Sequence, residues 1–90
     1  MSGEVRIPKF RRGVKFRFDP VRGAWVLLAP EKVFMPDAVA TEILKLVDGC
    51  RNIGAIADEL AARFAASREL IVSDISAALE DLAMRAAIDL

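Results

Sequence analysis

The chain has 90 residues, of which 54% are hydrophobic; 13 Lys and Arg balance 13 Asp and Glu, with no His and a single Cys. The length limits it to one domain, and the hydrophobic content excludes intrinsic disorder. The absence of His removes the commonest general base and metal ligand, and one Cys can form neither an internal disulfide nor a thiolate zinc site. We therefore expect no metal and no cofactor.

The zero net charge hides two oppositely charged segments. Residues 1–36 hold eight basic and three acidic groups, a net charge of +5, whereas residues 37–90 hold five basic and ten acidic groups, a net charge of −5. The longest apolar run, residues 24–29, is far shorter than the ~20 residues of a membrane span. The first four residues carry no apolar signal region, so we expect a cytoplasmic protein that does not enter membranes.

The first half of the chain predicts a flexible arm followed by a small sheet. Residues 1–13 are polar and basic and hold too little apolar surface to offset the entropy of ordering. Apolar and polar side chains alternate over residues 14–19, and residues 24–29 form a second apolar run. Prolines bracket a third short strand at residues 32–35. Residues 14–35 are therefore predicted to form a three-stranded antiparallel sheet.

After Pro36 the apolar spacing becomes helical, with Asp37, Asn52 and Ser67 as candidate N-caps. The expected helices span residues 37–48, 53–66 and 68–86. Strands followed by helices predict an α+β fold, in which the small sheet packs on a three-helix bundle. We expect residues 14–90 to form this single domain.

Catalytic chemistry finds little support. Glu80 and Asp81 are adjacent on a helix, so their carboxylates diverge by about 100° and cannot share one substrate atom. Cys50 has no His partner, and neither Gly49 nor Gly54 continues into a phosphate-binding motif. We expect a protein that is not an enzyme.

The short third strand is the most informative element for binding. Its residues Val33, Phe34 and Met35 are uncharged, and an unpaired edge there offers N–H and C=O groups to an extended peptide. Three alternatives remain open at this point. The flanking prolines keep the edge short and so prevent unwanted strand pairing, the edge accepts a peptide, or it pairs with a second copy of the chain. Monomer and homodimer are both compatible with the sequence.

A winged-helix nucleic-acid-binding protein is the alternative function, because a basic arm precedes a helical half. The charge of the last helix opposes it, since residues 69–90 carry five acidic groups and one basic group. A helix that enters a major groove approaches phosphates and should be basic. We therefore expect no nucleic-acid partner.

Residues 12–32 contain Arg12-Gly13, then Asp19-Pro20, Arg22-Gly23 and Ala29-Pro30-Glu31, and the helical half contains Asp48-Gly49. Over about residues 6–86 the chain resembles the PqqD family of pyrroloquinoline quinone (PQQ) biosynthesis proteins. The resemblance implies a winged-helix-like recognition domain for ribosomally made, modified peptides. It implies a peptide chaperone that binds the precursor peptide PqqA by β-strand addition and presents it to the radical SAM enzyme PqqE.

The resemblance also implies a site between the third strand and the third helix. The expected peptide-binding residues are Val33, Phe34, Met35, Ile71, Asp74, Ile75, Ala78 and Leu82. Four basic residues are left to contact an acidic patch on the partner enzyme: Arg11, Arg12, Lys15 and Arg17. The chain departs from the family pattern at residues 84–88, which lack a glycine, and this predicts that the last helix continues to residue 86.

Overall fold

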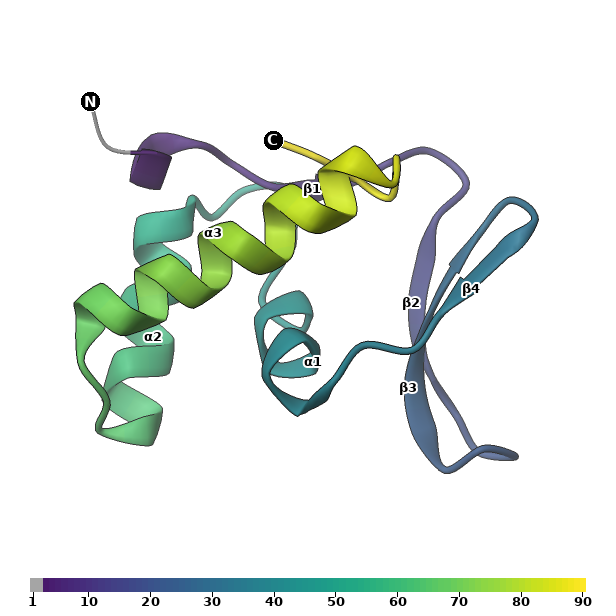
Figure 1. Cartoon of the computed structure of the whole chain (residues 1–90), viewed down its shortest axis with the longest axis horizontal. Helices are drawn as coiled ribbons and strands as arrows, with labels where there is room; N and C mark the ends of the chain where they lie inside the picture. The colour runs from purple at the N-terminus through teal and green to yellow at the C-terminus, as the bar shows by residue number, and fades with distance from the viewer. Residues whose placement is uncertain (1–2) are drawn as a thin grey trace.

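The computed structural model describes residues 3–90. Its elements in chain order are η1 (Gly3–Val5), β1 (Lys9–Phe10), β2 (Lys15–Asp19), β3 (Ala24–Ala29), β4 (Lys32–Phe34), α1 (Ala38–Leu44), α2 (Ile53–Phe64), α3 (Arg68–Met84) and β5 (Ile88–Asp89). Figure 1 shows the sheet of β2, β3 and β4 at one end, α2 at the other, α1 between them and α3 crossing the top. The expected α+β architecture is confirmed.

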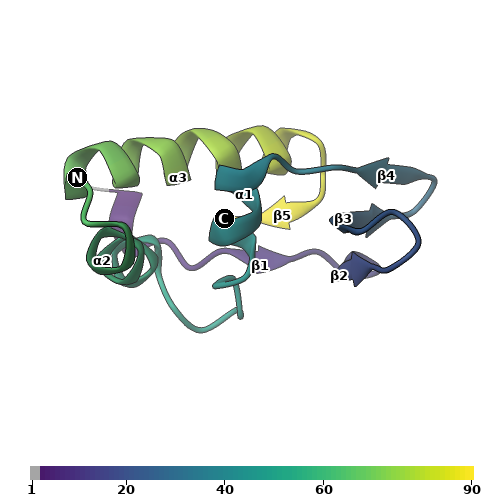
Figure 2. The same ribbon diagram turned by 90° about the horizontal axis from the view of Figure 1, so that it is seen from below.

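The three-stranded sheet is antiparallel, in the order β2-β3-β4. The register pairs Phe16 with Leu27 and Leu27 with Phe34, so these three side chains share the face that points towards the helices. Trp25 lies on the same face, where its ring stacks on Phe16 with 4.8 Å between centroids and Lys45 Nζ lies 5.2 Å above it. The opposite face is covered by no helix in either view of residues 3–90 (Figures 1 and 2).

The buried core lies mainly among the helices. Fully buried aliphatic residues come from all three helices, including Ile43, Ile56 and Ile75, and they meet Ile88 of β5. From the three-stranded sheet, Leu27 is the residue that joins this cluster, while Phe16 and Phe34 pack on it half-buried. Burying one such side chain stabilises the fold by about 1.5–3 kcal/mol. Because one residue of the three-stranded sheet is buried in the cluster, the apolar contact between sheet and helices is narrow.

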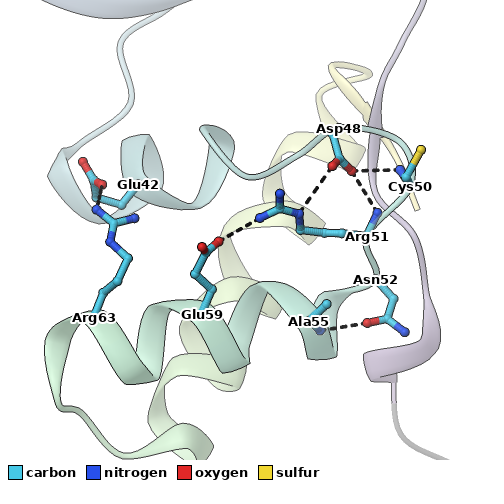
Figure 3. Close-up of polar contacts among 8 residues, drawn as sticks. All are labelled: Glu42, Asp48, Cys50, Arg51, Asn52, Ala55, Glu59 and Arg63. Carbon is cyan, nitrogen blue, oxygen red and sulfur yellow. Dashed lines mark hydrogen bonds and ion pairs between the residues drawn. The ribbon is translucent and has the colours of Figure 1, made fainter.

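Polar contacts fix the connection between α1 and α2 (Figure 3). The Asp48 carboxylate accepts N–H bonds from Cys50 and Arg51, at 2.9 and 2.8 Å. The Arg51 guanidinium in turn donates to Glu59 of α2 at 2.8 Å. Because one carboxylate satisfies two loop amides and faces a guanidinium bound to α2, it sets the direction in which the chain enters that helix.

Two of the three expected N-caps make a side-chain cap bond. Asp37 accepts from the N–H of Ala40, and Asn52 accepts from the N–H of Ala55, each at 2.8 Å. Ser67 occupies the expected N-cap position of α3, where its backbone C=O accepts the N–H of Ile71, but its side chain makes no cap bond.

The N-terminal segment differs from the expected flexible arm. Among residues 3–13, strand β1 pairs antiparallel with β5, placing Phe10 opposite Ile88. The backbone carbonyl of Arg6 accepts the N–H of Ile53 at the start of α2, and Pro8 is fully buried. The N-terminal segment is ordered because the C-terminal strand β5 pairs with its backbone and gives Phe10 an apolar neighbour in Ile88. Residues 1–2 of the expected arm lie outside the described part of the chain.

The helices end earlier than their apolar patterns predict. After α2, Ala65 adopts a left-handed conformation with φ 49°, and after α3, Ala86 does so with φ 62°. The expectation that the last helix continues to residue 86 is wrong, because Ala87 N–H bonds back to Leu82 C=O at 2.9 Å and closes the helix. After α1, the N–H groups of Leu46 and Val47 bond three residues back, which tightens the chain into a turn.

Replacing Ala86 with Gly should stabilise the protein. A left-handed conformation costs alanine about 1–2 kcal/mol, and glycine adopts it freely at an entropic cost of about 0.5–1 kcal/mol. We expect Ala86→Gly to raise the free energy of unfolding in urea by about 0.5 kcal/mol. The matched control, Ala83→Gly within α3, should lower it by about 1 kcal/mol; equal signs for the two variants would contradict this account.

Asp48 should contribute to the pH dependence of stability. Its pKa lies below the ordinary value because its carboxylate accepts backbone N–H bonds from Arg51 and Cys50 and faces the Arg51 guanidinium. A depressed folded pKa gives stability that is present above the unfolded pKa and is lost as the pH falls through the folded pKa. Urea unfolding should show the Asp48→Asn variant, which keeps a carbonyl acceptor, converging with the parent as the pH falls below about 4. If the unfolding free energies of the parent and of Asp48→Asn stay equally far apart at every pH, this account is contradicted. Glu69→Gln is the control, at an exposed carboxyl of α3.

Candidate peptide-binding site

Strand β4 is an edge of the three-stranded sheet, and its outer side pairs with no strand within residues 3–90. A two-residue loop joins Ala29 to Lys32, which face each other in the register. Such a loop closes on a hydrogen-bonded pair, and bonded and non-bonded pairs then alternate along an antiparallel ladder. Val33 is therefore the residue whose N–H and C=O point away from β3, towards the open side.

A groove of about 450 Å³ runs beside this edge, and we call it the edge groove. The strand and its C-terminal extension form one wall, the start of α1 forms the end, and the C-terminal half of α3 forms the other wall. Its lining residues are Leu27, Val33, Phe34, Met35, Pro36, Asp37, Ala40, Ala78, Asp81, Leu82 and Arg85. Figure 1 shows the chain between β4 and α1 passing below the C-terminal half of α3.

The edge groove combines an apolar floor with a charged rim. Leu27 and Leu82 are buried, whereas Val33 and Met35 are 52% and 60% exposed and supply apolar surface at the open side. Arg85 lies over the Phe34 ring, with 6.0 Å between the guanidinium carbon and the ring centroid. This groove fits an extended chain that pairs by its backbone and places alternate side chains between β4 and α3.

The polar part of the rim is an ion pair on α3. Arg85 Nε lies 3.1 Å from Asp81 Oδ2, and both side chains are more than half exposed. An exposed pair of this kind contributes little to stability, about 0–1 kcal/mol. Both groups can therefore exchange this partner for another at little cost in stability.

The structure brings together five of the eight predicted site residues and separates the other three. Val33, Phe34, Met35, Ala78 and Leu82 line the edge groove. Ile71, Asp74 and Ile75 line a second concavity of about 330 Å³ between the helices, which we call the helix hollow. Its other lining residues are Ala38, Val39, Glu42, Ile43, Leu60 and Phe64.

Sequence reasoning missed Asp81 and Arg85, which line the edge groove from α3. They continue the stripe of Ala78 and Leu82 at the three- and four-residue spacing of one helix face, and this spacing was the signal that could have found them. It also missed the start of α1, because only the turn at Pro36 brings Asp37 and Ala40 to the end of the groove.

The four basic residues predicted to contact a partner enzyme occupy different settings. Arg11 lies 3.8 Å from Asp89 of β5, while Arg12 follows in the turn after β1. Lys15 and Arg17 are exposed on β2, and neither forms an ion pair with any residue in the described range 3–90. The register places them beside Leu28 and Val26, on the sheet face that no helix covers.

The surface of α3 is unfavourable for nucleic acid. The helix exposes Glu69, Asp74, Glu80 and Asp81, whereas its first residue, Arg68, is engaged by Glu4 and Asp58 at 2.6 and 2.7 Å. Those two carboxylates raise the pKa of Arg68 above its ordinary value. Over residues 3–90 there is no cluster of three or more side chains able to hold a metal ion, and no helix is long and apolar enough to cross a membrane.

The fold and the groove together define a class: a small winged-helix-like α+β domain with an open strand edge beside its last helix. A family model described as coenzyme PQQ synthesis protein D (PqqD) matches residues 24–88. The chain belongs to this PqqD family.

Known proteins support the assignment at the level of sequence and fold. The PqqA binding protein of Bradyrhizobium diazoefficiens is 46% identical over 80 residues, which cover 89% of this chain and 78% of the relative. A solution NMR structure of the PqqD truncation of Methylobacterium extorquens PqqCD, described as a functional, stand-alone RiPP recognition element, superposes with a TM-score of 0.83 at 40% identity and covers 99% and 94% of the two chains. The crystal structure of PqqD from Xanthomonas campestris gives a TM-score of 0.59 at 33% identity, with 94% of each chain covered.

Proposed function

We propose that the chain is a non-catalytic peptide chaperone of PQQ biosynthesis, which binds the precursor peptide PqqA by adding it as a strand to β4. The observation that carries the proposal is the open β4 edge, which lies beside the edge groove against α3. Backbone pairing at the edge would supply affinity, and the groove would receive alternate side chains. The names of the relatives as PqqA binding proteins support the choice of peptide.

The proposed contact set follows from the groove. Val33 would donate and accept the backbone hydrogen bonds, and Phe34 and Met35 would flank the added strand. Ala78 and Leu82 would face it from α3. The chain turns into α1 at its N-cap Asp37, so pairing along this edge would stop at Met35 and the added strand would be short.

Removing the outward N–H of Val33 should weaken binding. Val33→Pro deletes the donor on the open side and leaves the β3 ladder intact, while Val33→Thr keeps both the donor and the side-chain shape. Loss of one or two hydrogen bonds should lower the affinity for synthetic PqqA about tenfold in the proline variant alone. Amide shifts recorded during a peptide titration measure the affinity, and unchanged β3 shifts confirm the fold.

Absence of saturable binding by the parent protein would refute strand addition, as would equal affinities for the two variants. The peptide and a second copy compete for the same edge, so sedimentation at several protein concentrations belongs with the titration. If β4 pairs with its own copy, added peptide should shift the chain from dimer to monomer.

We further propose that the bound peptide is presented to the radical SAM enzyme PqqE, in the cytoplasm where ribosomes make the precursor. The proposed docking residues are Lys15 and Arg17, with Arg11 and Arg12 nearby, and an acidic patch on the enzyme would face them. The charge on the outer side of β2 supports this choice, because Lys15 and Arg17 are exposed there and form no ion pair with any residue in the range 3–90.

Reversing the charge on β2 should separate enzyme binding from peptide binding. Lys15→Glu combined with Arg17→Glu should weaken binding to PqqE at low salt and reduce its salt dependence, because fewer charges are then screened. Calorimetry with PqqE and with PqqA measures the two affinities, and that for PqqA should stay unchanged. Arg22→Glu, at the tip of the same hairpin, is the control; a drop equal to that of the double variant would contradict a localised contact.

A further inference from the structure

The helix hollow and the edge groove lie in succession along α3. The hollow takes Ile71, Asp74 and Ile75 from the N-terminal half of the helix, and the groove takes residues from its C-terminal half. Asp74 and Asp81 are two turns apart, about 10 Å along the axis. An extended chain covers that distance in about three residues.

The helix hollow is built to receive an apolar group. Its floor consists of buried aliphatic side chains, among them Ile43, Leu60 and Ile75. On its rim, Val39 and Phe64 are 57% and 53% exposed although they are large apolar residues. A volume of about 330 Å³ falls within the range of ligand pockets. Apolar surface gathered around a concavity typically marks a binding site rather than packing.

The hollow connects to the edge groove around the start of α1. A third concavity, of about 500 Å³, borders both, because it shares Met35 and Pro36 with the edge groove and Ala38 and Phe64 with the helix hollow. Strand β4 runs towards this junction, and backbone pairing stops there because the chain turns into α1 at Asp37. A chain that leaves the edge at Pro36 therefore meets this third concavity, which leads to the hollow.

The charges on the rim select the neighbours of an apolar group. Glu42 is held by Lys45 and Arg63, each at 3.1 Å, and these contacts lower its pKa. Asp74 is exposed and forms no ion pair with the residues described, 3–90. The rim thus presents one unneutralised carboxylate, which favours a cation beside the occupant.

We propose that the helix hollow is a second subsite for the bound peptide. It holds a large apolar side chain from the part of the peptide that runs on past the Pro36 end of β4, and a basic side chain next to it pairs with Asp74. The inference rests on the proposed strand addition. It assigns Ile71, Asp74 and Ile75 to a subsite separate from the strand groove.

The test compares matched variants with full-length PqqA and with fragments shortened from either end. Phe64→Ala removes one wall of the hollow, and Leu70→Ala removes an exposed apolar side chain of α3 that does not line it. We expect about a fivefold loss of affinity for Phe64→Ala and none for Leu70→Ala. Asp74→Asn should cost about twofold at low salt and nothing at high salt, with Glu69→Gln as its control.

Fragments locate the effect on the peptide. A fragment that lacks the anchoring residue should bind the parent and Phe64→Ala equally well, yet still bind Val33→Pro more weakly than the parent. Methyl shifts of Ile71 and Ile75 should accompany binding of full-length PqqA and be absent with that fragment.

The outcomes separate this inference from the proposed function. If Val33→Pro weakens binding while Phe64→Ala binds like the parent and the methyl signals stay in place, the second subsite is refuted and strand addition stands. If the parent shows no saturable binding of PqqA, both are refuted. Losses specific to the full-length peptide in Phe64→Ala, with matching methyl shifts, establish the subsite.

Discussion

The structure depends on the narrow apolar contact through which the sheet meets the helices. Leu27 is the sheet residue fully buried in the main cluster, and the Phe16 and Phe34 rings beside it are half-buried. A small chain buries only about 60–65% of its unfolded surface, so it cannot cover both faces and both edges of its sheet. Strand β4 keeps an open edge and β2 exposes Lys15 and Arg17, and these are the two places to which we assign partners.

The periodicities of the chain predicted the elements, whereas contacts between distant residues decided their limits. The alternation around Phe16 and the helical spacing after Pro36 depend on local burial, which a sequence displays directly. The pairing of β1 with β5 joins residues nearly 80 positions apart, and no local pattern encodes it. The left-handed conformation of Ala86 could not be predicted from the sequence either, because glycine is the residue expected in that conformation. Here the burial of Ala87 and Ile88 imposes the turn on an alanine.

The site was predictable in its strand and less so in its helix. Val33, Phe34 and Met35 follow from their place between two prolines, but one apolar stripe on α3 does not reveal that α1 divides it into two concavities. Ile71 and Ile75 continue the spacing of Ala78 and Leu82, yet the start of α1 lies against the helix between them. Which concavity a residue lines depends on where Pro36 turns the chain, and this is a tertiary property.

Part of the charge separation along the chain is used within the fold. Arg6 and Arg11 of the basic segment approach Glu80 and Asp89 of the acidic segment. Arg68 of the acidic segment pairs with Glu4 of the basic segment and with Asp58 of its own. These pairs are exposed and individually weak, but together they hold the N-terminal segment along the helices, where β1 adds a second point of attachment. Among the charges that form no ion pair within residues 3–90 are Lys15 and Arg17 on the outer face of β2 and Asp74 beside the helix hollow, and each lies at a proposed contact surface. A peptide held by its backbone at β4 gains little sequence selectivity from that pairing, so selectivity has to come from side-chain sites such as the hollow.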